Sequence, residues 1–306
     1  MLSIQHLSHV YPNGVRALDD VSLEIPPGMF GLLGPNGAGK SSLMRCLATL
    51  QVPTGGAIRF GDIDVLRQPE ALRATLGYLP QDFGVYPRVS AEDMLAHLAV
   101  LKGVAGRGER RDTVDTLLRQ VNLWEVRKRP LAGFSGGMRQ RFGIAQALIG
   151  NPRLVIVDEP TAGLDPEERN RFNNLLAEIG ESVVVILSTH IVDDVTDLCE
   201  RMAILAGGRI VEAGTPAALI EGLAGRIWRA EIDRRDLEAA RARHAVIATR
   251  LAAGRLAIRV LADTSPGVGF APAEPGLEDV YFTTLHRERQ ALAAAAAAGA
   301  DQRQAA

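Results

Sequence analysis

The chain has 306 residues, of which 47% are hydrophobic and 23% are charged, which suffices for one large domain and one small domain with separate cores. A formal net charge of -2 provides no overall basic surface, so the composition does not argue for a nucleic-acid partner, and none is expected. The two cysteines, Cys46 and Cys199, lie far apart and form no metal-binding or disulfide pattern, which indicates a reducing compartment.

The N-terminal part of the chain predicts short strands around a glycine-rich loop. Residues 2–10 and 21–25 alternate between apolar and polar side chains, as strands with one exposed face do. Gly28 to Leu33 indicates a buried strand that runs into the loop. The remaining elements expected in this part are a helix over Ser41 to Leu50, a strand over 57–60, and helices over 91–102 and 109–123.

Two uninterrupted apolar runs follow, Leu154 to Val157 and Val183 to Leu187. Runs without alternation suit strands covered on both faces, as in a parallel α/β sheet. A helix over Gln140 to Ile149 is expected after the pair Gly136-Gly137. No apolar run approaches the ~20 residues that a membrane-spanning helix requires, and the first part of the chain lacks the pattern of a signal peptide, so we expect a soluble chain.

The character of the sequence changes after Gly214-Thr215-Pro216. A short helix, strands over 227–232 and 256–261, and an arginine- and alanine-rich helix over 234–244 predict a small α+β domain. We therefore expect three parts: a first domain over 1–216, a small domain over 217–288, and an alanine-rich tail over 289–306 that is disordered or a frayed helix.

The glycine-rich loop matches the pattern G-x-x-x-x-G-K-[ST] between a predicted strand and a predicted helix. Glycines let the backbone turn several N–H groups toward phosphate oxygens, and the following helix adds the partial positive charge of its N-terminus. Lys40 would reach the β- and γ-phosphates, and the Ser41 hydroxyl would ligate Mg²⁺. The phosphate-binding residues expected here are Gly34, Pro35, Asn36, Gly37, Ala38, Gly39, Lys40, Ser41 and Ser42.

Two adjacent carboxylates, Asp158 and Glu159, end the first apolar run. Side chains at the carboxyl end of such a strand meet a ligand at the edge of the sheet. Asp158 would hold Mg²⁺, directly or through water, and Glu159 would accept the proton of the attacking water. The pair adds a prediction of hydrolysis to the prediction of phosphate binding.

A further motif, Phe134-Ser135-Gly136-Gly137-Met138, resembles the LSGGQ signature of ATP-binding-cassette (ABC) ATPases. Phe134 and Met138 depart from the usual Leu and Gln, whereas Ser135, Gly136 and Gly137 match. The resemblance extends over residues 2 to about 216 in the order that the family shows. The other matching positions are Tyr11, as the aromatic that stacks on adenine, Gln81, as the Q-loop glutamine that contacts Mg²⁺ and the attacking water, Asp165, as the D-loop aspartate, and His190, as the switch histidine that contacts the γ-phosphate.

The resemblance implies a P-loop ATPase core with an antiparallel β subdomain and a helical subdomain, followed by the small α+β domain. It also implies that ATP and Mg²⁺ are bound between two subunits in a head-to-tail dimer. A second copy of the chain is the simplest partner, and a heterodimer is the alternative. In this family, a separate membrane permease holds the ATPase at the cytoplasmic face of the membrane. Residues 82–89, with Phe83 and Tyr86, resemble the region that receives the permease.

The segment 277–282 resembles the ending of ATPases from drug- and antibiotic-resistance exporters, which favours export and a dimerisation or regulatory role for the small domain. A soluble ABC ATPase that acts on DNA or ribosomes is the alternative. The short interval between Lys40 and Asp158 shows no sustained heptads, and the chain carries one cassette, which argues against it. A P-loop kinase or GTPase is disfavoured by the signature motif and by the lack of Asn-Lys-x-Asp.

Overall fold

The computed structural model describes residues 1–161, 163–180, 183–252 and 254–304. The chain divides into two compact units, Met1–Ile210 and Val211–Ala306, and each is described by itself. The bounds of the three predicted parts, with their division near residue 216, stay a prediction.

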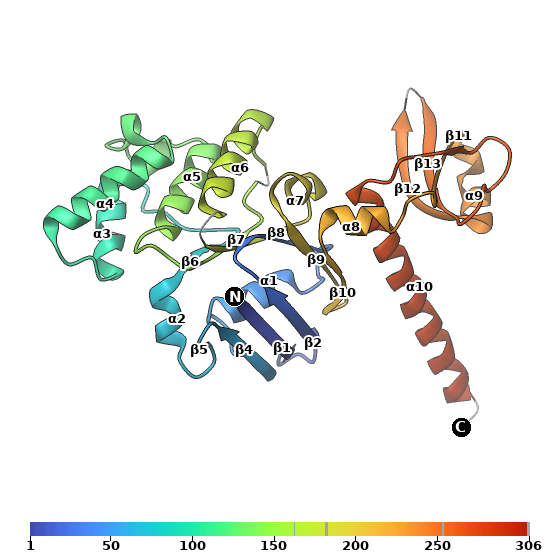
Figure 1. Ribbon diagram of the computed structural model, residues 1–306, viewed down its shortest axis with the longest axis horizontal. Helices are drawn as coiled ribbons and strands as arrows, with labels where there is room; N and C mark the ends of the chain where they lie inside the picture. The colour runs from blue at the N-terminus through green and yellow to red at the C-terminus, as the bar shows by residue number, and fades with distance from the viewer. Residues whose placement is uncertain (162, 181–182, 253, 305–306) are drawn as a thin grey trace. The chain divides into compact units, whose positions relative to one another are not determined.

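A six-stranded sheet with the order β10-β9-β3-β8-β7-β6 forms the centre of the larger unit (Figure 1). β3 pairs in parallel with β8 and β9, and β7 pairs in parallel with β6 and β8. Every side chain of β7 is buried, because helices cover both faces of the sheet. The predicted parallel sheet is confirmed. Its strands are β3 (Gly28–Leu33), β6 (Leu76–Leu79), β7 (Leu154–Asp158), β8 (Val184–Thr189), β9 (Arg201–Ala206) and β10 (Arg209–Gly214).

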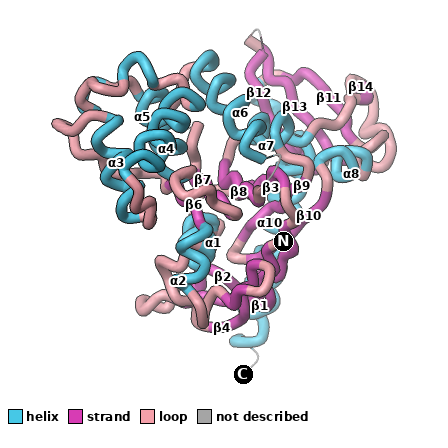
Figure 2. Tube along the Cα trace, turned by 60° about the vertical axis from the view of Figure 1, so that its left-hand side comes forward, coloured by secondary structure: helices cyan, strands magenta, loops and turns pink. Residues whose placement is uncertain are grey.

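A second, antiparallel sheet with the order β2-β1-β4-β5 lies below α1 in Figure 2. The alternation of β1 buries Leu2, Ile4 and Leu7 in the same core cluster as the apolar side chains of α1, and α1 contacts β2, β7 and β8. One continuous core therefore joins the two sheets through this helix, and the helix that follows the glycine-rich loop is held from both sides. The elements are β1 (Leu2–Val10), β2 (Arg16–Ile25), α1 (Lys40–Leu47), β4 (Gly55–Phe60) and β5 (Ile63–Asp64).

The middle of the larger unit is helical, as predicted. Helix boundaries differ from the expected ones by a few residues, and the largest shift is at α5. The helix expected from Gln140 begins at Gly136, because the Ser135 hydroxyl caps it by accepting a hydrogen bond from the Met138 N–H at 3.2 Å. Glycines are poor helix formers, which is why the sequence pattern placed the start after them. The helices are α2 (Pro69–Thr75), α3 (Ala91–Leu101), α4 (Arg107–Gln120), η1 (Trp124–Val126), η2 (Leu131–Gly133), α5 (Gly136–Ala147), α6 (Pro166–Gly180) and α7 (Val192–Leu198).

The smaller unit contains a four-stranded sheet with the order β12-β13-β11-β14, in which the pairs are antiparallel. The strands expected over 227–232 and 256–261 are present as β11 and β13, whereas β12 was not expected. Positions 305–306 of the predicted tail lie outside the described residues. The elements are α8 (Pro216–Glu221), β11 (Ile227–Ile232), η3 (Arg234–Asp236), α9 (Leu237–Arg243), β12 (Ala245–Ala252), β13 (Arg255–Leu261), β14 (Ala271–Pro272) and α10 (Leu277–Gln304).

Across the described ranges, no helix combines the length and the apolar character that crossing a membrane would require.

Candidate functional site

The parallel register brings three segments to one edge of the central sheet. The glycine-rich loop follows β3, Asp158 is the last residue of β7, and His190 follows β8. Leu33 lies opposite Thr189, and Asp158 lies opposite Ser188. Because the carboxyl ends of parallel strands meet at the same edge, residues far apart in the sequence are placed around one loop.

The glycine-rich loop is bent by glycines that no other residue replaces without strain. Gly37 and Gly39 have left-handed backbone conformations, with φ of 78° and 108°. A Cβ on Gly39 would lie 2.3 Å from the Ala17 carbonyl oxygen. The buried Lys40 ammonium donates a hydrogen bond to the Gly34 carbonyl at 2.6 Å, so the side chain folds back across its own loop.

The two carboxylates at the end of β7 have different surroundings. Glu159 adopts a left-handed conformation with φ of 51°, and its N–H donates to the Ser188 carbonyl at 2.8 Å. Its carboxylate oxygens lie 2.5 Å from His190 Nδ1 and 3.4 Å from Lys40 Nζ. A strained backbone at a buried acid is a feature of functional sites, and here it aims Glu159 between a histidine and a lysine.

Asp158 is only 3% exposed, and its pKa is raised above the ordinary value. Burial is the main cause and the adjacent Glu159 adds to it, whereas Ser188, Lys40 and Ser41 act in the opposite direction. Within the described part of the chain, Asp158 Oδ1 has no hydrogen-bond partner. A buried carboxylate oxygen without a partner suits a cation ligand.

The glycine-rich loop, Glu159 and His190 border one cavity with a volume of about 420 Å³, whereas Asp158 is not among its lining residues. Tyr11, Gln81, Glu159 and His190 are brought together there with the loop. The sequence analysis did not predict that Val15, Arg16 and Ala17 line this cavity. The turn that follows Tyr11 could have indicated it, because it returns the chain toward the glycine-rich loop. The cavity is lined by Tyr11, Val15, Arg16, Ala17, Pro35, Asn36, Gly37, Gly39, Lys40, Ser41, Ser42, Gln81, Glu159 and His190.

Tyr11 is fixed at the side of this cavity. Its hydroxyl lies 3.0 Å from Ser42 Oγ and donates to Gln51 Oε1 at 3.4 Å. The His9 ring packs edge-on against it, with 4.7 Å between the centroids. The aromatic ring therefore has a defined position beside the glycine-rich loop.

The signature residues and Asp165 lie elsewhere in the same unit. Ser135 caps α5, and Asp165 caps α6 by accepting a hydrogen bond from the Glu168 N–H at 2.9 Å. A Cβ on Gly137 would lie 2.4 Å from Glu168 Oε2, so the N-termini of the two helices are in close contact. Of the described residues that line the cavity, none belongs to the signature motif or is Asp165.

Asp194 of α7 is a fully buried carboxylate that links α7 to α6 and to the segment after Glu159. It accepts hydrogen bonds from Thr161 Oγ1 at 2.6 Å, from Arg169 Nε at 2.7 Å and from Asn173 Nδ2 at 3.2 Å. Thr161 lies two residues after Glu159, and α7 begins two residues after His190. The network therefore ties together the segments that carry these two side chains.

Comparison with known proteins identifies the family. Residues 18–162 match the family described as ABC transporter. The chain is 33% identical over 256 residues to the daunorubicin/doxorubicin resistance ATP-binding protein DrrA of Streptomyces peucetius, covering 83% of this chain and 75% of that protein. The chain belongs to the ABC transporter ATP-binding proteins. As an ABC cassette it binds ATP and is an ATPase.

Another relative of this ABC cassette is named for import, whereas the name of DrrA refers to drug resistance and states no direction of transport. The chain is 35% identical over 245 residues to the phosphonates import ATP-binding protein PhnC of Chromohalobacter salexigens, covering 76% of this chain and 90% of that protein. Among solved structures, the dimeric post-hydrolysis state of the ATP-binding cassette MJ0796 bound to ADP and Pi has a TM-score of 0.64 at 25% identity, covering 70% of this chain and 98% of that chain. The P-loop fold is confirmed, whereas the direction of transport is not decided.

Proposed function

We propose that this ABC ATPase powers export through a separate membrane permease, by closing as a head-to-tail homodimer around two ATP molecules and opening after hydrolysis. One observation supports the proposed dimer: the signature residues lie outside the cavity that the same chain forms with its glycine-rich loop. A second copy, turned head to tail, would bring its signature motif to that cavity.

The N-terminus of α5 suits a phosphate of the facing subunit. Gly136 has no atom within 4 Å of the position that a Cβ would take, so the backbone is open there. The first N–H groups of a helix lack partners within the helix and attract anions. Ser135, Gly136 and Gly137 would therefore complete the charge stabilisation that one subunit leaves open, and Asp165 would meet the partner near the same interface.

The residues around the cavity divide the chemistry among them. Lys40 would bind the β- and γ-phosphates after releasing the Gly34 carbonyl. Glu159 would accept the proton of the attacking water, while His190, at 2.5 Å, would hold its carboxylate and contact the γ-phosphate. Tyr11 would stack on adenine from its fixed position beside the loop.

The residues present fit a magnesium ion. Asp158 offers an unpartnered buried oxygen, the exposed Ser41 hydroxyl lies in the same region, and Gln81 lines the cavity. Mg²⁺ is held in nucleotide sites by one or two protein oxygens together with phosphates. Bound there, the ion would neutralise charge that develops on the phosphates.

Replacing Lys40 with alanine tests the ATP site directly. We expect ATP binding to be lost, because a phosphate-facing cation is removed from a buried position. Isothermal titration of ATP into the purified variant measures the loss. Unchanged ATP affinity, with the unfolding temperature of the wild type, would contradict the role of Lys40.

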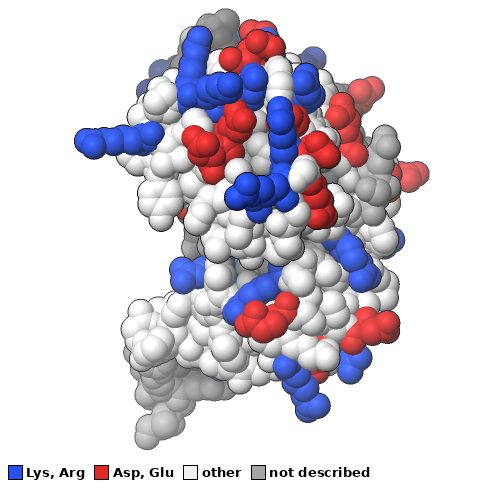
Figure 3. Space-filling view, turned by 90° about the vertical axis from the view of Figure 1, so that its left-hand side faces the viewer, with Lys and Arg blue, Asp and Glu red and all other residues white. Residues whose placement is uncertain are grey.

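The proposed docking surface for the permease is a groove beside residues 82–89. Two hollows of about 390 and 460 Å³ share Leu98, Leu101 and Gln146. Tyr86 and Leu101 are 63% and 69% exposed there, and exposed large apolar side chains mark interaction sites. Figure 3 looks onto the side of the larger unit that carries α3 and α4, where acidic and basic side chains are mixed. We therefore expect apolar contacts to dominate.

A charge in this groove is expected to release the permease without slowing ATP hydrolysis. The change is Leu101→Asp, which puts a carboxylate where an apolar segment would pack. The partner for the test is the product of a neighbouring gene with about six apolar stretches of ~20 residues. Co-purification of the two in detergent measures the association. Val52→Asp is the control, since Val52 is exposed and does not line the groove. If Leu101→Asp retains the complex, or if the two variants retain it equally, the groove is not the docking surface.

Export rests on the likeness to DrrA, whose printed name refers to drug resistance, and on the resemblance of segment 277–282. The smaller unit would stabilise or regulate the dimer. Through the permease, the ATPase would be held at the cytoplasmic face of the membrane as a peripheral subunit. No observation in the described residues favours the alternative of a soluble ABC ATPase that acts on DNA or ribosomes.

A further inference from the structure

Arg16 lies at the ATP cavity without belonging to any of the motifs described above. It is the first residue of β2 and lines the cavity together with Val15 and Ala17. The Ala17 carbonyl lies against Gly39, where an added Cβ would approach it to 2.3 Å. The start of β2 therefore runs along the end of the glycine-rich loop that leads into α1.

Arg16 and Lys40 are the two cationic side chains among the described residues that line the cavity. Lys40 is 6% exposed and already faces the Glu159 carboxylate. The Arg16 side chain is 61% exposed, and its guanidinium pairs with Asp19 instead of reaching the bottom of the cavity. Arg16 therefore provides positive charge at the rim, where Tyr11 marks the adenine end.

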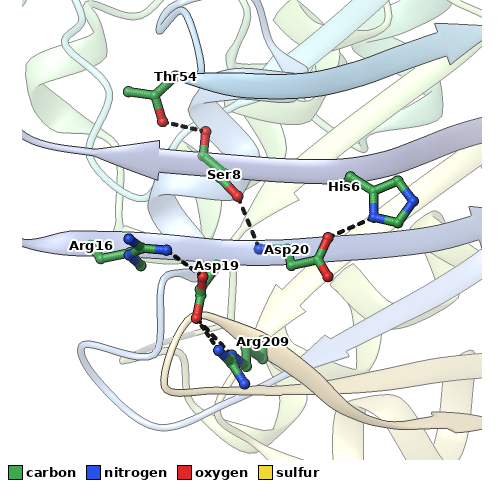
Figure 4. A network of polar contacts seen from close by, with 7 residues as sticks. All are labelled: His6, Ser8, Arg16, Asp19, Asp20, Thr54 and Arg209. Atoms are coloured by element: carbon green, nitrogen blue, oxygen red, sulfur yellow. Dashed lines mark hydrogen bonds and ion pairs between the residues drawn. The ribbon is translucent and has the colours of Figure 1, made fainter.

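Asp19 holds Arg16 in this place. An Nη1 of Arg16 lies 2.7 Å from Asp19 Oδ1, and Nε of Arg209 donates to Asp19 Oδ2 at 2.7 Å. Figure 4 shows the two guanidinium groups reaching the same carboxylate from β2 and from β10. Hydrogen bonds from Arg16 and then Arg209 lower the pKa of Asp19, so it stays ionised at neutral pH.

The backbone around Asp19 is tied to the phosphate loop itself. The Asp19 N–H donates to the Gly208 carbonyl at 2.9 Å, and the Gly208 N–H donates to the Ala38 carbonyl at 3.0 Å. Arg209 directly follows Gly208, and its guanidinium donates a hydrogen bond to the Asp19 carboxylate. Because Arg209 alone can neutralise Asp19, Arg16 is able to turn toward an anion without leaving a carboxylate unpaired.

We propose that Arg16 binds the α-phosphate of the nucleotide and that Asp19, anchored by Arg209, positions it. The inference rests on the ATP site described above. A guanidinium presents a planar fork of donors that matches phosphate oxygens, which suits Arg16 for this contact. The α-phosphate is the one nearest the adenine end of the cavity, whereas Lys40 serves the β- and γ-phosphates.

The test compares dissociation constants of ATP and ADP for the full chain, measured by isothermal titration. Arg16→Ala is expected to weaken both nucleotides by the same factor, about tenfold, because both carry the α-phosphate. Arg16→Lys is expected to restore part of the loss. A loss confined to ATP, or an affinity within twofold of the wild type, overturns the proposal.

A double-mutant cycle tests the positioning role of Asp19. Asp19→Asn is expected to weaken both nucleotides by about threefold and to add nothing in the double variant with Arg16→Ala, because it acts through that arginine. Full additivity overturns the positioning role.

Arg241→Ala is the matched control, since Arg241 forms a surface pair of the same spacing with Glu238 at 3.0 Å. Failure of the wild type to bind ATP would contradict the ATP site as a whole. Loss with Lys40→Ala, but none with Arg16→Ala, would contradict this inference alone.

Discussion

Glutamine at position 159 is expected to lower the rate of ATP hydrolysis by about 10²–10⁴-fold while ATP remains bound. The carboxylate of Glu159 lies 2.5 Å from His190 and 3.4 Å from the Lys40 ammonium, inside the cavity that the glycine-rich loop forms. An amide of the same shape cannot accept a proton from water, whereas the groups that bind phosphate stay in place. The step that fails should therefore be chemistry and not binding.

Phosphate release and oligomeric state give the two measurements for Glu159→Gln. Because hydrolysis reopens the proposed dimer, the variant should accumulate as an ATP-bound dimer in size-exclusion chromatography with light scattering. Glu178→Gln, an exposed carboxylate of α6, is the matched control and should hydrolyse ATP at the wild-type rate. Hydrolysis by Glu159→Gln near that rate would remove Glu159 as the base.

The sequence was sufficient to predict the elements whose signals are local. The apolar run before Asp158 indicated a strand buried on both faces, and β7 is buried throughout. The loop pattern, with Lys40 at its end, predicted both the strand before it and the helix after it. These features depend on neighbours in the chain, so periodicity and composition were enough.

The features that were missed depend on contacts between distant segments. The start of α5 at Gly136 contradicts helix propensity and depends on the Ser135 cap and on the close approach of Glu168 to Gly137. Arg16 lies at the cavity because β2 returns beside the loop. Asp194, in the acidic segment after His190, has the sequence signature of a solvated helix start, yet it is completely buried.

Alanine at position 194 is expected to lower the free energy of unfolding by about 3 kcal/mol, at the lower end of the range for breaking a buried ion pair. The carboxylate is fully buried and accepts hydrogen bonds from Thr161, Arg169 and Asn173. Removal leaves these donors facing an apolar space, and the Arg169 side chain, 26% exposed, recovers only part of its solvation. Urea unfolding followed by circular dichroism measures the change. The control is Asp197→Ala, because Asp197 is exposed in the same helix. Equal unfolding midpoints for the two variants would contradict the stabilising role of the network.

A milder change separates stability from catalysis in this network. Thr161→Val keeps nearly the same volume and removes one hydrogen bond to Asp194, at 2.6 Å. Because Thr161 follows Glu159 by two residues and α7 follows His190 by two, the loss should loosen the pair that acts on water more than the loop that binds phosphate. We expect kcat to fall by about tenfold, the range of one hydrogen bond to a charged group, with the ATP dissociation constant within twofold of the wild type. A fall in affinity that matches the fall in kcat would instead mean that the network supports the fold of the whole cavity.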